Sequence, residues 1–261
     1  ASQYWGKKDT ETIRKVASIA MRTALVLMLA LFVIVSLFPE QAVGLFTNDA
    51  EIIAEGVKYL NIVRFTYPFF CVTTILLAVL RSTEVVKIAF YLSLSTLCIN
   101  FCINWCLIYG RFGLPRLGVQ GAAIGTLVAR IVECIIILCY VAKKERNLGL
   151  KLRDFLHVDR SIMRDYYRVS LPILFISAMW GVNTAMQTAI LGHLTSSAIA
   201  ANSMASNLYL IVKTVAVGAA STTNVFIGKA IGEGDMKVVK QYAKTFQVMF
   251  LIMGICCGLI L

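Results

Sequence analysis

The residue spacing first suggests an ion pair at membrane depth. Glu133 stands in a long apolar run, and Arg130 precedes it by three positions. On a helix this spacing puts both side chains on one face, where they can pair. A charge at the centre of a membrane helix costs about 2.5–3.5 kcal/mol on insertion scales and therefore needs a reason. Two interpretations stay open: a self-neutralised structural pair, or a Glu133 that carries a proton or binds a cation.

Amide side chains form a second group of candidate residues. Asn100 and Asn104 are one helical turn apart, as are Asn183 and Gln187. Amides can coordinate a cation, orient water or bond to a neighbouring helix. We predict ion-coupling roles for Glu133 and the first pair, with interhelical bonding as the alternative. Substrate-binding positions are predicted at Trp180, Asn183, Gln187, Asn202 and Asn207, where Trp180 either stacks on a flat cation or packs as an ordinary aromatic.

Two more basic residues, Arg64 and Lys213, lie within apolar runs. We expect Arg64 to face protein or a water-filled cavity, because a lone charge does not face lipid. Lys213 is near the middle of its run, where it would repel a cationic substrate. Its expected partner is an acid on a helix outside these 261 residues.

Membrane helices must position all of these side chains. The chain is 59% apolar and only 15% charged, with a mean hydropathy of +0.78, whereas soluble domains are about 45–50% apolar and about 25% charged. A bilayer-spanning helix needs roughly 20 residues. The sequence therefore predicts an all-α integral membrane protein whose seven spans cover about 17–38, 56–81, 87–109, 119–142, 168–192, 196–228 and 237 to the last residue.

The basic residues behind the net charge of +11 follow the predicted membrane topology. Most Lys and Arg residues lie in the segments 1–22, 81–87, 143–168 and 229–244, which alternate with neutral or acidic segments. This pattern places the basic segments on the cytoplasmic side and argues against a nucleic-acid surface. The eight Cys all lie in apolar runs without zinc-ligand spacing, so no metal site or catalytic set is predicted.

Two stretches of the chain resemble each other at an offset of 226 residues. In YWGKKDTETIRKVA (4–17) and AIGEGDMKVVKQYA (230–243), Gly6 aligns with Gly232 and Asp9 with Asp235. Each stretch is a basic inner loop that runs into a membrane helix, which favours an internal repeat of the kind found in transporters. The chain is then expected to be the middle of a longer protein.

Three further stretches carry a family resemblance. The segments QYWGKKD (3–9), GVQGAAIGTLVAR (118–130) and 196–235 resemble the multidrug and toxic compound extrusion (MATE) family, in the right order and spacing. The resemblance implies a two-lobe, pseudo-symmetric transporter. Residues 1–142 would end the N-terminal lobe, 143–168 would be a cytoplasmic amphipathic linker, and 169–261 would begin the C-terminal lobe.

By this resemblance the protein is a multi-pass, monomeric antiporter of the bacterial plasma membrane. It would export small organic cations or amphiphiles in exchange for Na⁺ or H⁺, without another cofactor. Some proton-coupled members have Asp where Asn104 stands, and some Na⁺-coupled members have Glu where Trp180 stands, so the coupling ion is left open. A lipid-linked oligosaccharide flippase of the same superfamily is the alternative. An intramembrane enzyme is disfavoured, because the only two His flank the spans.

Overall fold

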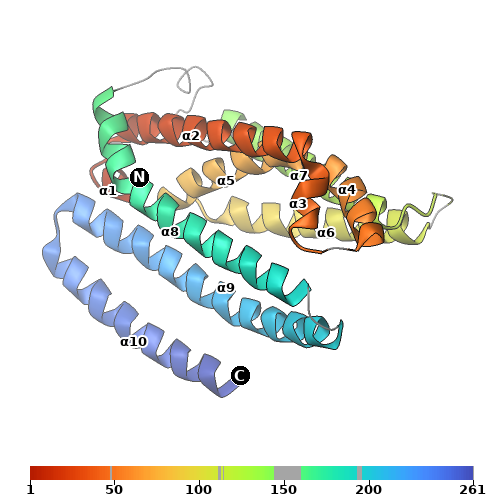
Figure 1. Cartoon of the computed structure of the whole chain (residues 1–261). Coiled ribbons are helices and arrows are strands. Elements are labelled where there is room, and N and C mark those ends of the chain that lie inside the picture. The colour runs from red at the N-terminus through yellow and green to blue at the C-terminus, as the bar shows by residue number, and fades with distance from the viewer. Residues whose placement is uncertain (48, 111–112, 114, 144–159, 193–195, 261) are drawn as a thin grey trace.

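A computed structural model of the chain describes residues 1–47, 49–110, 113, 115–143, 160–192 and 196–260, and all regular structure in these residues is α-helical (Figure 1). Six of the described helices are long and apolar enough to cross a membrane, and a bent pair makes a seventh span. The predicted all-α fold with about seven spans is confirmed. The helices are α1 (Ser2–Gly6), α2 (Thr10–Leu37), α3 (Pro39–Gly44), α4 (Ala50–Val63), α5 (Thr66–Ser82), α6 (Lys87–Tyr109), α7 (Val119–Lys143), α8 (Arg160–Gly192), α9 (Ser196–Glu233) and α10 (Met236–Ile260).

The second span is broken, which corrects the single helix predicted over 56–81. α4 and α5 meet at 53° across Arg64 and Phe65. Pro68 lies in the first turn of α5, where its missing N–H costs nothing. Inside one continuous helix that N–H would be needed by the carbonyl of Arg64, so the chain bends there instead. The span also begins at Ala50, earlier than predicted, with Asp49 accepting the N–H groups of Glu51 and Ile52.

α8 begins at Arg160, inside the segment that we predicted as a linker over 143–168. Residues 160–168 therefore extend the helix by about two turns. The side chain of Tyr167 hydrogen-bonds that of Thr23 on α2 at 2.9 Å, so this extension packs against the N-terminal half. The rest of the predicted linker, including His157, lies outside the described residues, as does His193.

The local geometry of the two repeated stretches is the same. Asp9 caps α2 by accepting the N–H of Thr12, and Asp235, 226 positions later, caps α10 by accepting the N–H of Val238. The residue before each cap has a positive φ, which is 60° at Lys8 and 81° at Gly234. The hydrogen bonds from Thr12 also hold the pKa of Asp9 below its ordinary value. Equal turns, caps and following helices support the internal repeat inferred from the sequence.

The repeated stretches also contact each other. A Cβ on Gly6 would collide with the backbone of Lys229, and one on Gly232 would collide with the carbonyl of Gln3. α1 and α9 therefore cross with almost no side chain between them, as small residues allow in membrane proteins. Figure 1 shows α1 at the end of the molecule that also holds the α9–α10 turn.

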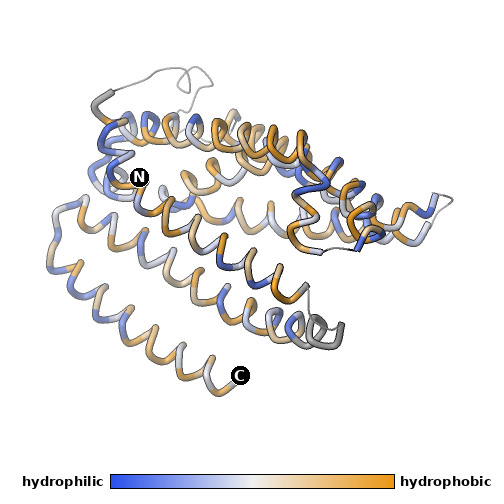
Figure 2. The backbone as a smooth tube through the Cα atoms, in the orientation of Figure 1, coloured by the Kyte–Doolittle hydropathy of each residue, from blue (hydrophilic) through white to orange (hydrophobic). Residues whose placement is uncertain are grey.

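The buried core belongs almost entirely to the N-terminal half. Ile13, Leu80, Leu92 and Ile137, from four different helices, are each at most 1% exposed. In α8–α10, Ala230 is the one hydrophobic residue that is buried among the residues described. Hydrophobic residues nevertheless dominate the spans of both halves, and hydrophilic residues gather near α1 and the start of α10 (Figure 2). The broad apolar surface of α8–α10 is that of a membrane protein.

Candidate functional site

The Arg130–Glu133 pair forms on α7 as its spacing suggests. Arg130 Nη1 lies 2.5 Å from Glu133 Oε2, and the Glu133 side chain is 6% exposed while that of Arg130 is 34% exposed. The guanidinium carbon of Arg130 also lies 5.1 Å from the ring centroid of Phe70 on α5. Arg130 thus holds its charge between a buried carboxylate and an aromatic face.

A chain of hydrogen bonds runs from α6 to α7 beside this pair. Asn104 donates to Asn100 at 3.1 Å, and Asn100 donates to the Thr126 hydroxyl at 3.5 Å, which donates to the Ala122 carbonyl at 2.9 Å. The Asn104 carbonyl oxygen packs against Gly125, where a Cβ would collide with it. Asn104 is therefore a positioning residue, whereas Asn100 presents its amide to the space beyond.

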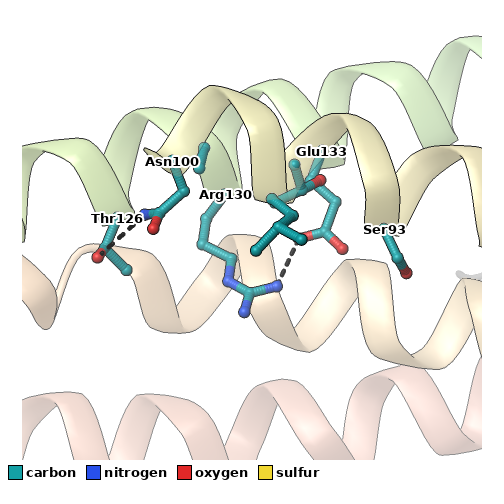
Figure 3. A pocket seen from close by; sticks show the side chains of 8 residues that line it. Ser93, Asn100, Thr126, Arg130 and Glu133 are labelled. Carbon is teal, nitrogen blue, oxygen red and sulfur yellow. Dashed lines mark hydrogen bonds and ion pairs between the residues drawn. The ribbon is translucent and has the colours of Figure 1, made fainter. Parts of the chain in front are cut away.

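That space is a polar cavity of about 350 Å³ between α6 and α7. Figure 3 shows the ion pair and the Asn100–Thr126 hydrogen bond along its wall. Its lining offers carboxylate, amide and hydroxyl oxygens, which are the donors that hard cations prefer. The lining residues are Ser93, Thr96, Leu97, Asn100, Thr126, Ala129, Arg130 and Glu133.

An apolar cavity of about 460 Å³ lies between α2 and α5. Phe70 lines this cavity and Arg130 lines the polar one, so the contact between their side chains links the walls of the two cavities. The cavity is suited to the hydrophobic body of a small molecule. It is lined by Ala24, Leu27, Met28, Leu31, Tyr67, Phe70, Cys71, Thr74 and Ile75.

A second membrane-depth cation lies in the C-terminal half. Lys213 Nζ on α9 is 3.3 Å from the ring centroid of Trp180 on α8 and 5.8 Å from that of Tyr209. Among the described residues Lys213 has no carboxylate within ion-pair distance. Trp180 was predicted to stack on a cation, and the cation over its ring is the chain's own lysine.

The other predicted substrate-binding residues fall into two places. Asn202 and Asn207 line a cavity of about 360 Å³ between the last turns of α8 and the first turns of α9, together with Phe46, Thr188, Leu191, Ser203 and Ser206. Asn183 and Gln187 lie exposed on α8 and line none of these cavities. The structure therefore does not bring the five predicted substrate-binding residues together in one cavity.

Arg64 lies apart from both sites, at the break between α4 and α5. Its guanidinium carbon is 5.2 Å from the ring centroid of Phe65, and its buried Nε has no hydrogen-bond partner in the described part of the chain. Ser93 and Thr96 were not among the predicted residues, although their spacing from Asn100 places all three on one helix face. Tyr67 and Phe70 were not predicted either, because no local pattern distinguishes them from packing aromatics.

Comparison with known proteins decides the family. The MatE family model matches residues 1–106 and 172–261. The chain belongs to the MatE family. This assignment confirms the resemblance in the sequence and places the chain among membrane transporters rather than intramembrane enzymes. Among the residues described, no group of three or more His, Cys, Asp or Glu lies close enough to hold a metal ion.

Several MatE relatives are similar to the chain over most of its length. It is 24% identical to the probable multidrug resistance protein YoeA of Bacillus subtilis over 245 residues. That alignment covers 93% of this chain and 53% of YoeA. It is 25% identical over 219 residues to the multidrug resistance protein NorM of Vibrio cholerae, covering 82% of this chain and 47% of NorM. The chain thus spans about half the length of the curated relatives it matches.

Solved structures of MatE transporters share the fold. The eukaryotic MATE transporter AtDTX14 superposes with a TM-score of 0.81 at 17% identity, over 99% of this chain and 57% of that one. A structure described as a MOP superfamily transporter from Pyrococcus furiosus superposes with a TM-score of 0.78 at 20% identity, over 98% of this chain and 56% of that one.

Proposed function

We propose that the complete protein is a secondary-active antiporter that exports organic cations or amphiphilic compounds in exchange for Na⁺ or H⁺. One observation carries the proposal: a buried carboxylate, Glu133, is paired with Arg130 in a polar cavity of a MatE transporter fold. An acid buried in a membrane helix is costly, and such residues commonly mark an ion or substrate pathway. The multidrug resistance relatives support the substrate class.

Glu133 is the group on which the coupling ion would act. A proton on its carboxylate, or Na⁺ beside it, competes with Arg130 for the same negative charge. Asn100 and Thr126 supply further oxygens on the same cavity wall, and Asn104 holds the Asn100 amide in place. Because the Glu133 carboxylate is almost fully enclosed, either ion would strongly alter its attraction for the guanidinium.

Arg130 would transmit that change to the substrate. Its guanidinium lies over Phe70, whose side chain lines the apolar cavity between α2 and α5. When Glu133 is neutralised, Arg130 is left as an unbalanced cation beside that cavity, and a bound organic cation is repelled. When Glu133 is charged, the pair is neutral and the cavity accepts a cation. Ion and substrate would therefore bind in alternation, which is what antiport requires.

Ion-driven dye movement tests the proposal. The complete protein is placed in inside-out vesicles with ethidium, and a Na⁺ gradient or a pH gradient is imposed separately. We expect one gradient to drive ethidium, and Glu133→Ala to abolish the response. Glu55→Gln is the matched control, because Glu55 pairs with Lys58 at the same three-residue spacing but about half exposed.

Two results would overturn the antiporter. Ethidium that moves equally with and without either gradient would contradict coupling. No ethidium movement at all, together with movement of a lipid-linked sugar across the same vesicles, would support the flippase instead.

A further inference from the structure

The two halves of the chain hold the same carboxylate where their ends meet. Glu84, in the turn between α5 and α6, accepts hydrogen bonds of 2.8 Å on both oxygens from the Lys229 ammonium on α9, and one of 3.2 Å from the indole N–H of Trp5 on α1. All three residues come from basic segments that the charge pattern places in the cytoplasm. Trp5 also packs against the buried core of the N-terminal half. The carboxylate therefore joins that core to a helix of the other half.

Glu84 holds the left-handed position that ends α5. The Val85 N–H bonds the Leu80 carbonyl and the Glu84 N–H bonds that of Arg81, which is a common way to close a helix. The residue at this position is usually glycine, because its φ is positive, and here φ is 64°. A glutamate in this conformation costs energy that glycine would not. Its presence indicates a role for the carboxylate that it carries.

The helices beside this carboxylate cross reciprocally. Gly6 on α1 lies against the Lys229 backbone, and Gly232 on α9 lies against the carbonyl of Gln3. At the repeat offset of 226 residues, Gly6 aligns with Gly232 and Gln3 aligns with Lys229. Each half thus makes the same contact on the other, as two copies do across a twofold axis. Transporters with internal repeats work by rocking one repeat against the other, so such a movement opens or closes this crossing.

The contact between Glu84 and Lys229 can separate at little cost. Their side chains are 36% and 32% exposed, and an ion pair with that exposure contributes little to stability. Both line a cavity of about 460 Å³ that is lined from both halves, where water has room to hydrate the two charges once they part. From this end of the molecule α9 runs away from α2 (Figure 1). The halves therefore meet at the cytoplasmic end and diverge beyond it.

We propose that Glu84, Lys229 and Trp5 form a latch that closes the cytoplasmic side of the transporter and opens once in each transport cycle. This inference rests on the proposed transport function and adds a conformational step to it. The latch is closed in the structure. Lys229 has to leave Glu84 before the halves part and a compound from the cytoplasm enters between them. Trp5 belongs to the same half as Glu84, so its indole keeps the carboxylate in place while the latch is open.

Distances between spin labels test the latch in the complete protein. Labels on p-acetylphenylalanine, which avoids the eight cysteines, are placed at Lys87 on α6 and Lys237 on α10, one in each half. A second pair at Lys87 and Lys143 lies within the N-terminal half and serves as the control. Double electron–electron resonance is measured in phosphatidylcholine nanodiscs. We expect a short and a longer distance between the halves, for the closed and open latch, and one distance for the control pair.

The variants show whether the ion pair holds the latch. Glu84→Gln should raise the open fraction about threefold, as expected for loss of an exposed ion pair, and Lys229→Met should do the same. The exchange variant Glu84→Lys with Lys229→Glu should lower the open fraction again, because the pair forms with its charges reversed. Glu11→Gln is the matched control. Glu11 pairs with Lys15 at the same 2.8 Å, but within α2, so its loss should leave the open fraction unchanged.

A reversible cross-link shows whether opening is required for transport. Glu84→Cys with Lys229→Cys, joined by a short bifunctional methanethiosulfonate, should lose the longer distance and stop moving ethidium, and dithiothreitol should restore both. Glu11→Cys with Lys15→Cys is treated in the same way. It carries the same native cysteines, so reactions at those positions affect both proteins equally, and it should transport as the wild type does.

Three outcomes would overturn the latch. They are a single short distance between the halves in every variant, an equal open fraction in the wild type and Glu84→Gln, and ethidium movement that continues in the cross-linked protein. The distances are measured without an ion gradient or ethidium, so they test the latch even when no gradient drives the dye. A latch that opens in a protein without gradient-driven transport would contradict the antiporter alone.

Discussion

The two halves of the molecule treat a membrane-depth cation in different ways. In the N-terminal half, Arg130 is neutralised by Glu133 from its own helix, inside a packed core. In the C-terminal half, Lys213 lies over aromatic rings of a thinly packed helix pair, and no acid in the described structure pairs with it. Where a cation has its own counter-ion, an ion that binds the counter-ion changes the net charge of the pair. A cation without one in the described residues has to be balanced by water or by a group on another helix.

A third charged site, at Glu84, links the two halves of the molecule. Glu84 accepts hydrogen bonds from Lys229 of α9 at 2.8 Å and from the indole N–H of Trp5 at 3.2 Å. Its backbone has a φ of 64°, a conformation that costs energy outside glycine. The three charged sites thus range from enclosed to partly exposed, and substitutions at each should differ in sign and size.

The largest effect is expected in the N-terminal half. Glu133→Gln leaves the Arg130 charge without a counter-ion, and breaking a buried pair this way typically costs 3–5 kcal/mol. We expect about 3 kcal/mol of lost stability, because Arg130 is still partly exposed. Thermal unfolding in detergent measures it, and the double variant Arg130→Gln with Glu133→Gln should recover most of the loss. If the single variant is as stable as the wild type, the pair does not hold the fold.

A smaller effect is expected where the halves cross. Gly6→Ala places a Cβ against the Lys229 backbone, and overpacking of this kind costs about 2 kcal/mol. Gly254→Ala in α10 is the matched control, since a Cβ there meets nothing within 4 Å and alanine favours the helix. Unfolding of both variants in one preparation checks the difference. Equal stability of the two would mean that α1 and α9 separate without cost.

Lys213→Met should change stability in the opposite direction to Glu133→Gln. Removing a charge from membrane depth recovers about 2.5–3.5 kcal/mol, and the lost cation–π contacts cost up to about 2 kcal/mol. We therefore expect a gain of about 1 kcal/mol, read from the same unfolding measurement. A loss of stability similar to that of Glu133→Gln would show that an acid partners Lys213 and that the halves do not differ.

The bridge at Glu84 should give the smallest effect and a pH dependence. The hydrogen bond from Lys229 lowers the pKa of Glu84 below its ordinary value of 4.5, so the ionised carboxylate stabilises the fold above that pH. This contribution is lost as the pH falls below 4.5 through the folded-state pKa. We expect less than about 1 kcal/mol, because the side chain is 36% exposed.

Unfolding at pH 6 and pH 3 tests this bridge, with Glu84→Gln as the variant and Glu40→Gln as the exposed control. The wild type should lose more stability on acidification than Glu84→Gln does, by the amount assigned to the bridge. An equal loss in both would show that Glu84 does not link the halves.

Local features were predictable from the sequence and distant ones were not. Hydropathy located the spans, and the three-residue spacing placed Arg130 beside Glu133, because both depend on one helix alone. The contact of Lys213 with Trp180, and that of Glu84 with Trp5 and Lys229, join residues on separate helices. No spacing rule connects such residues, so their partners appear only once the helices pack. The roles of Asn183, Gln187, Asn202 and Asn207 in substrate binding stay predictions.

The most direct test of the account asks whether Glu133 couples transport or only balances Arg130. Ethidium transport driven by an ion gradient is measured for the complete protein carrying both Arg130→Gln and Glu133→Gln, the variant expected to regain its stability. If Glu133 couples transport, the double variant is folded but the gradient no longer drives ethidium. Gradient-driven transport at the wild-type level in this double variant would contradict it and make the pair purely structural.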